Sequence, residues 1–105
     1  MMKKRLEIVK TNPGEPVKAI YYLDNELSFI NALEIKDEIL SKQDRFEHLT
    51  IQANLDHLDL TGIQLLYSIR RTIETQNKKL SLNIKLEEGL SSLISRCGFN
   101  ELIIR

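Results

Sequence analysis

The sequence predicts a single α/β domain that covers residues 1–105. Three observations support this: segments with alternating apolar and polar residues, helical apolar stripes between them, and glycine- or proline-containing turns at their boundaries. Strands that alternate with short helices along a chain favour a layered α/β structure. A length of 105 residues suits one domain, and an apolar content of 42% is enough for its core.

The N-terminal segment is predicted to form a β-hairpin. Apolar and polar residues alternate over residues 4–10, which is typical of a half-buried strand. Residues 11–16 contain both prolines and one glycine and therefore form a turn. Residues 17–23 are rich in β-branched and aromatic side chains, and we expect this second strand to end before Asp24 and Asn25.

A helix and a third strand follow. The helix begins at Phe29 or Ala32 and ends at Ser41, and Asn31 and Glu34 have the spacing of a capping box. The apolar positions expected to lie together on or beside one side of it are Ile30, Leu33, Ile35, Ile39 and Leu40. After a polar connection, residues 49–54 alternate as the third strand.

The C-terminal half adds a second helix, a fourth strand and a last helix. Leu66, Ile69 and Ile73 form an apolar stripe on a helix that ends near Asn77. Residues 80–86 alternate with a period of two, which indicates a strand. A third helix carries Leu90, Leu93, Ile94 and Cys97 and ends at Gly98, and residues 102–104 form a short strand or a final turn.

The charge balance argues against several classes of partner. Lysine plus arginine total 15 and aspartate plus glutamate total 15, so the net charge is zero. Such a chain has no basic footprint for nucleic acid or for an anionic membrane surface. His48, His57 and Cys97 are the only imidazole or thiol ligands, which argues against a catalytic metal site.

The chain is expected to be a cytoplasmic domain. Its single cysteine cannot form an internal disulfide, which suits a reducing compartment. The basic N-terminus is followed by an alternating segment and not by the apolar run of a signal peptide. No apolar stretch approaches the roughly 20 residues that span a bilayer, so we expect no membrane insertion.

The most informative segment is Asp59-Leu60-Thr61-Gly62, between the third strand and the second helix. Thr61 is expected to be the N-cap, accepting a hydrogen bond from the backbone of Gln64, whose side chain reaches back to complete a capping box. Leu60 and Leu65 have the spacing of a hydrophobic staple. Asp59 adds a negative charge near the positive end of the helix dipole. These residues alone predict the start of a helix, and they do not by themselves indicate that Thr61 is a reactive group.

The whole pattern resembles the STAS domain, the family of anti-sigma factor antagonists and sulfate-transporter tails. That family has an Asp-Ser-Ser-Gly turn between its third strand and second helix, where this chain has residues 59–62. Residues 26–32 stand where the family has its Gly-Glu-Leu-Asp turn, and residues 97–99 match its closing Gly-Leu. The resemblance implies a mixed sheet of four to five strands with about three to four helices packed mainly on one face.

The resemblance also implies a function. In the family the hydroxyl before the glycine is the phosphoacceptor of a partner kinase, which assigns that role to Thr61. The chain would then be a phosphorylation-controlled interaction module and not an enzyme. The residues expected to bind the partner are Asn25, Glu26, Asp59, Leu60, Gly62, Gln64 and Leu65.

The implied partner is a kinase-type anti-sigma factor, which is captured by the unmodified domain and released by phosphorylation. A phosphatase is a further implied partner, and the chain itself needs no cofactor because the kinase supplies ATP and Mg²⁺. Three alternatives stay open: an accessory subunit of a membrane transport complex, a scaffold of the kind associated with chemotaxis, and a small enzyme. The enzyme is the least favoured of these, because the sequence shows no pair of a nucleophile and a base. Residues 26–29 and 62–66 also resemble the chemotaxis-associated STAS proteins.

Overall fold

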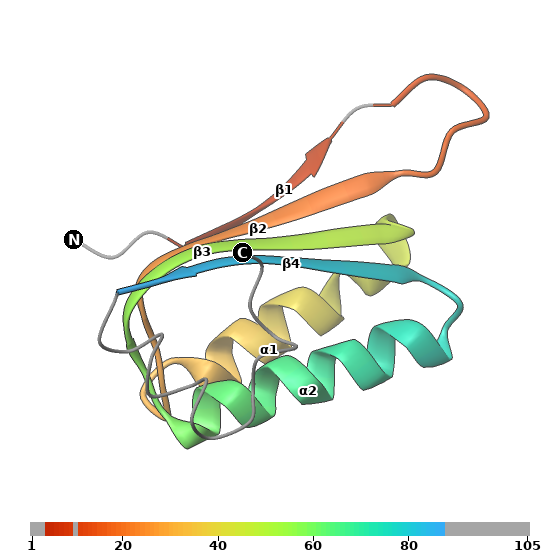
Figure 1. Ribbon diagram of the computed structural model, residues 1–105. Coiled ribbons are helices and arrows are strands. Elements are labelled where there is room, and N and C mark those ends of the chain that lie inside the picture. Colours follow the sequence, from red (N-terminus) through yellow and green to blue (C-terminus); the bar gives the residue numbers. More distant parts are fainter. Residues whose placement is uncertain (1–3, 10, 88–105) are drawn as a thin grey trace.

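The computed structural model describes residues 4–9 and 11–87, which form one sheet covered by helices on one face (Figure 1). The sheet has the strand order β1-β2-β3-β4. The strands are β1 (Lys4–Val9), β2 (Lys18–Leu27), β3 (His48–Leu58) and β4 (Lys79–Leu86). β1 pairs antiparallel with β2, whereas the β2–β3 and β3–β4 pairs are parallel. The expected mixed sheet of four to five strands is therefore confirmed, with four strands in the described residues.

Two α-helices connect the parallel strands. α1 (Ala32–Ser41) and the short 3₁₀ helix η1 (Gln43–Arg45) link β2 to β3, and α2 (Leu60–Thr75) links β3 to β4. The two α-helices contact each other beneath the sheet (Figure 1). The described residues thus hold two α-helices and not the three to four expected, because the predicted helix from Leu90 to Cys97 and the segment 102–104 lie outside them. Neither described helix has an apolar stretch long enough to cross a membrane.

The core lies between the helices and one face of the sheet. Alternate residues of the three parallel strands point inward, as the period of two in the sequence predicts. They pack against a stripe on each helix, with Ile35 and Ile39 from α1 and Ile69 and Ile73 from α2 almost fully buried.

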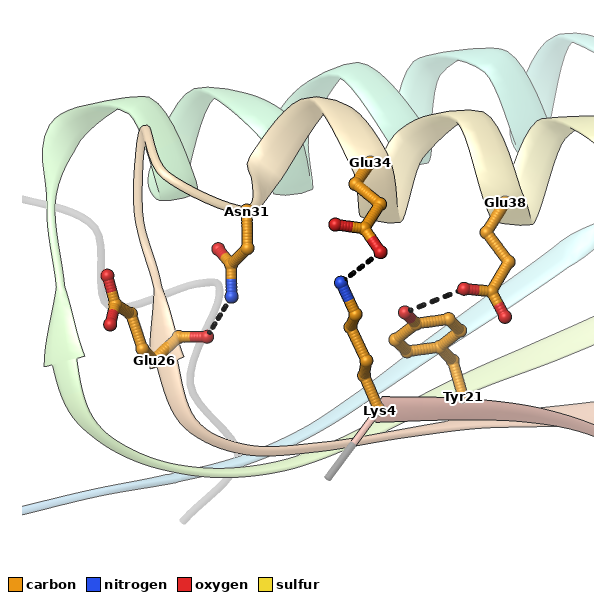
Figure 2. Close-up of polar contacts among 6 residues, drawn as sticks. All are labelled: Lys4, Tyr21, Glu26, Asn31, Glu34 and Glu38. Carbon is orange, nitrogen blue, oxygen red and sulfur yellow. Dashed lines mark hydrogen bonds and ion pairs between the residues drawn. The ribbon is translucent and has the colours of Figure 1, made fainter. Parts of the chain in front are cut away.

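Tyr21 of β2 brings a polar atom to the margin of this core. Its ring is fully buried, and its hydroxyl donates a hydrogen bond to Oε2 of Glu38 on α1 at 3.3 Å (Figure 2). Burial, and secondly the nearby Glu38 carboxylate, raises the pKa of Tyr21 far above its ordinary value. The Tyr21 hydroxyl therefore keeps its proton, and its hydrogen bond to Glu38, over the whole neutral pH range.

β2 continues past the point where the sequence predicts its end. Asn25 adopts a positive φ of 77°, and the register of the β2–β3 pair shifts between Asn25 and Glu26. This irregularity lets the strand resume its pairing, so that Leu27 lies opposite Leu58. Asparagine tolerates the left-handed conformation better than most residues, which explains why a predicted turn former lies inside a strand.

Parallel pairing places two loops at the same edge of the sheet. β2 and β3 are parallel, so their carboxyl ends lie side by side, at Leu27 and Leu58. The chain enters α1 from the first end and α2 from the second, and the N-termini of both helices meet there (Figure 1). Ligand and partner sites of parallel α/β sheets form preferentially at this edge.

Candidate functional site

Asp59 joins the two loops at the carboxyl edge of the sheet. Its backbone is extended (φ −108°, ψ 179°), and its Oδ1 accepts a hydrogen bond from the Gly62 N–H at 2.9 Å. Its Oδ2 accepts a second bond from the N–H of Phe29 at 3.0 Å. The Asp59 N–H donates to the carbonyl oxygen of Leu27 at 3.3 Å. One residue therefore caps α2 and fixes the loop that leads into α1.

Thr61 is not the N-cap, contrary to the prediction from the sequence. α2 begins at Leu60, so Thr61 is its second residue, with an exposed side chain that makes no hydrogen bond within the described residues. Aspartate is at least as good a cap as threonine, and Asp59 has the extended backbone that a cap requires. The Thr61 hydroxyl is consequently left without a structural role in the described part of the chain.

The predicted capping box and staple of α2 are wrong for the same reason. With the cap at Asp59, the staple positions become Leu58 and Ile63. Leu60 points to solvent and is 59% exposed, and Leu65 lies in the core. Gln64 is exposed on the first turns of the helix and does not pair back to Thr61.

Gly62 lies directly against the end of β2. A Cβ atom added at Gly62 would lie 2.3 Å from the carbonyl oxygen of Leu27, a distance that no real contact tolerates. The absence of a side chain thus lets the first turn of α2 approach the backbone of the neighbouring strand. This close approach sets the position of Leu60 and Thr61 relative to the β2–α1 loop.

A network of buried polar groups holds the β2–α1 loop. Asn31 is 2% exposed; its Oδ1 accepts a hydrogen bond from the Ser28 N–H at 3.0 Å, and its Nδ2 donates to the Glu26 carbonyl oxygen at 2.8 Å (Figure 2). Ser28 is fully buried; its Oγ donates to the Glu26 carboxylate and accepts from the Ile30 N–H at 3.2 Å. These bonds fix the backbone on which Phe29 and Ile30 are carried.

The capping box predicted for α1 is therefore wrong as well. Asn31 occupies the N-cap position but uses its amide within the loop, and its side chain accepts no bond from the first turn of α1. Instead, the backbone N–H of Ala32 donates to the Ser28 carbonyl oxygen at 2.8 Å. Glu34 points away from Asn31 and forms an ion pair with Lys4 of β1 (Figure 2).

Large apolar side chains gather in solvent around these loops. Among the described residues, five large hydrophobic side chains are exposed, and four of them belong to the starts of the two helices. We call these four the apolar surface: Phe29 (72% exposed), Ile30 (70%), Leu33 (70%) and Leu60 (59%). Exposed apolar side chains that are concentrated in one region mark interaction sites more often than scattered ones do.

The sequence does not predict this surface, because Ile30 and Leu33 have the spacing of the apolar, core-facing side of a helix. α1 buries Ala32, Ile35 and Ile39, and this stripe is sufficient to cover its part of the sheet. Leu33 is a surplus apolar residue outside the stripe. The signal in the sequence was the number of apolar residues at the helix start, which exceeds what one face can bury.

A shallow groove of about 260 Å³ separates the first turns of α1 and α2. Leu33 and Lys36 line it from α1, and Thr61, Gln64 and Ser68 line it from α2. The residues on each wall are three or four positions apart, which places them along one face of each helix. Thr61 thus lies at the mouth of a groove whose other wall carries both an apolar and a cationic side chain.

The predicted site residues divide into three groups. Leu60, Thr61 and Gln64 are exposed on α2, where a partner could reach them. Glu26, Asp59 and Gly62 are half-buried or buried and hold the two loops in position, and Leu65 lies at the floor of the groove. Asn25 is exposed but lines a different hollow with Asp56 and Lys85.

No metal-binding set was found in the part of the chain that the structure describes. Within residues 4–9 and 11–87, no three His, Cys, Asp or Glu side chains lie close enough together to hold a metal ion. Cys97, one of the candidate ligands noted in the sequence, lies outside these residues.

The family of the chain follows from its match to a family model. The model of the STAS domain matches residues 8–105, nearly the full length. The chain belongs to the STAS domain family. The resemblance seen in the Asp59–Gly62 turn is therefore confirmed for the chain as a whole.

A solved structure supports the same fold. The anti-sigma factor antagonist SpoIIAA in its unphosphorylated form is similar to this STAS domain with a TM-score of 0.71. The match covers 97% of this chain and 86% of that chain, at 15% sequence identity. At this identity the likeness establishes a shared fold. None of the curated proteins compared with the sequence matches it.

Proposed function

We propose that this STAS domain is a phosphorylation-controlled interaction module of the anti-sigma factor antagonist type. In its unmodified form it binds a kinase-type anti-sigma factor, and phosphorylation of Thr61 releases that partner. The observation that supports this proposal best is the position of Thr61: an exposed hydroxyl with no hydrogen bond in the described structure, in the first turn of α2. The proposed role is that of a binding switch and not of an enzyme.

The apolar surface supplies the contact area for the partner. Leu60 precedes Thr61 in α2, Leu33 lies across the groove from Thr61, and Gln64 adds a polar group that lines the same groove. Phe29 and Ile30 are exposed on the loop that leads into α1. Large apolar anchors that a partner can desolvate carry most of the free energy in protein interfaces. In this proposal, Asp59, Gly62 and Glu26 act indirectly, by fixing the backbone that presents these side chains.

The proposed modification is a phosphoryl transfer catalysed by the partner. The Thr61 Oγ1 forms a bond to the γ-phosphorus of ATP, the bond from that phosphorus to the ADP oxygen breaks, and the hydroxyl proton passes to a base of the kinase. The kinase holds the ATP and its Mg²⁺. A phosphatase partner restores the hydroxyl by transferring the phosphoryl group to water.

The added charge explains how one modification ends the interaction. A phosphothreonine carries about 1.5 to 2 negative charges at neutral pH. At position 61 this charge lies next to the exposed Leu60, so a bound partner would have to remove water from it. It also lies two residues after Asp59, whose carboxylate carries a charge of the same sign. The N-terminus of α2 tolerates an anion, so the fold survives while the apolar contact is lost.

Intact-mass measurement tests the proposal. The domain is incubated with ATP, Mg²⁺ and the kinase-type anti-sigma factor proposed as its partner, and we expect a mass gain of one phosphoryl group. Thr61→Ala removes the gain. Thr75→Ala keeps it, because Thr75 is an exposed threonine at the far end of the same helix. An unmodified wild type, or a gain that persists in Thr61→Ala, contradicts the proposal and favours the scaffold or transport-subunit alternatives.

A further inference from the structure

Lys36 is a cation without a counter-ion on the groove wall opposite Thr61. It lies one helical turn after Leu33 on α1 and lines the same groove as Thr61 and Gln64. Its side chain is half-buried, and it forms no hydrogen bond or ion pair within the described residues. Lys4 pairs with Glu34, and Lys78 donates to the Gln43 carbonyl oxygen. Other described lysines also form no such contact, but Lys36 is the lysine that lines the groove beside Thr61.

The groove itself offers Lys36 no anion. The other residues that line it are apolar or neutral: Ala32, Leu33, Thr61, Gln64, Leu65 and Ser68. The Asp59 carboxylate, which is the acidic group next to Thr61, uses its oxygens to accept bonds from Gly62 and Phe29. A phosphate on the Thr61 hydroxyl would therefore be the anion that this groove lacks.

We infer that Lys36 is the intramolecular counter-ion of a phosphate group on Thr61. This inference rests on the proposed phosphorylation of Thr61. It adds that an ion pair with Lys36 stabilises the phosphorylated form. The ammonium group lies on a flexible four-carbon stem, and Lys36 lines the same groove as Thr61, so we expect the pair to form without movement of α1. The pair bridges the two helices and occupies the groove, so phosphorylation closes a surface that the partner uses as well as charging it.

The phosphate itself reports on this pair. A cation about 6 Å away in a solvated groove lowers the second pKa of a phosphate by roughly 0.5. Phosphothreonine is installed at position 61 of the full chain by genetic encoding, so no kinase is needed, and the pKa is measured by ³¹P NMR titration. The variants compared are Lys36→Gln, Lys36→Arg and Lys79→Gln, and Lys79 is an exposed lysine at the amino end of β4.

The inference predicts a distinct result for each variant. In Lys36→Gln the second pKa of the phosphate is higher than in the wild type by about 0.5. Lys36→Arg stays close to the wild type, and Lys79→Gln does not change the pKa. Equal values in the wild type and Lys36→Gln, or an equal rise in Lys79→Gln, overturn the inference. Failure of any kinase to modify Thr61 would instead overturn the proposed function and leave this measurement valid.

Discussion

The Asp59 carboxylate accepts a hydrogen bond from the backbone N–H of Phe29 at 3.0 Å, across 30 residues of sequence. The same carboxylate caps α2 through Gly62, so a single side chain couples the start of one helix to the loop that precedes the other. Phe29 supplies the N–H of this contact, and Leu60 follows Asp59 directly in the chain. Both residues belong to the apolar surface. The shape of the proposed partner surface therefore depends on Asp59.

Replacing Asp59 should destabilise the domain. Asp59→Ala removes the cap of α2 and the bond to Phe29, so we expect the free energy of unfolding to fall by roughly 1 to 2 kcal/mol. Urea denaturation measures this loss. Asp37→Ala is the control, because Asp37 is exposed on α1 and makes no hydrogen bond or ion pair within the described residues. Equal stabilities for the two variants would contradict the bridging role of Asp59.

A side chain at position 62 should be poorly tolerated. Gly62→Ala places a Cβ atom 2.3 Å from the Leu27 carbonyl oxygen, and relief requires α2 to move away from β2. We expect a loss of roughly 2 to 3 kcal/mol in urea denaturation. The neighbouring Thr61→Ala should change stability by less than about 0.5 kcal/mol, because Asp59 and not Thr61 caps the helix. A large loss of stability in Thr61→Ala would instead indicate that Thr61 caps the helix, as the sequence predicts.

The apolar surface should matter for binding and not for stability. The double variant Leu33→Ser, Leu60→Ser removes two side chains that are 70% and 59% exposed. We expect affinity for the partner to fall about tenfold or more in isothermal titration calorimetry, with unfolding unchanged within about 0.5 kcal/mol. Ile8→Ser is the matched control, because Ile8 is the remaining exposed large hydrophobic among the described residues and lies on β1. Unaltered affinity in the double variant would show that Leu33 and Leu60 do not contribute to the interface.

Alkaline pH should destabilise the domain through Tyr21. The folded state raises the pKa of this phenol above its ordinary value of 10.0, chiefly by burial. The unfolded chain therefore loses the proton first, and stability falls as the pH rises above about 10, by at most about 1.4 kcal/mol per pH unit. Below that pH the contribution is fully present.

Denaturation between about pH 9 and 11 tests the role of Tyr21. Tyr21→Phe should flatten the pH dependence, although it also removes the bond to Glu38. Tyr22→Phe is the control, because Tyr22 points to the other side of the sheet, beneath the guanidinium of Arg5. The same slope in the wild type and in Tyr21→Phe would assign the pH dependence to other groups.

The periodic parts of the sequence predict the fold well. Leu82 and Ile84 alternate with polar residues and point into the core of the observed β4, and Ile69 and Ile73 form the buried stripe of α2. Such patterns succeed because a strand or helix on one face of a sheet must bury one side. The sequence predicts the end of β2 too early, because the register shift between Asn25 and Glu26 depends on pairing with β3, which local sequence does not specify.

The details of the site depend on contacts that sequence spacing cannot reveal. Thr61 and Asp59 are both good capping residues, and the bond from Phe29 N–H to Asp59 joins segments 30 residues apart. Asn31 has the spacing of a cap but is used by the Ser28 backbone and the Glu26 carbonyl. The exposure of Leu33 likewise follows from how little of α1 the sheet can cover.

The affinity of the partner for two forms of the domain tests the central claim most directly. Phosphothreonine is encoded at position 61, and calorimetry compares this form with the unmodified protein against the same kinase-type partner. We predict that the phosphorylated form binds at least about tenfold more weakly, with an unchanged circular dichroism spectrum. Equal affinities for the two forms would contradict the proposal that Thr61 phosphorylation controls the interaction.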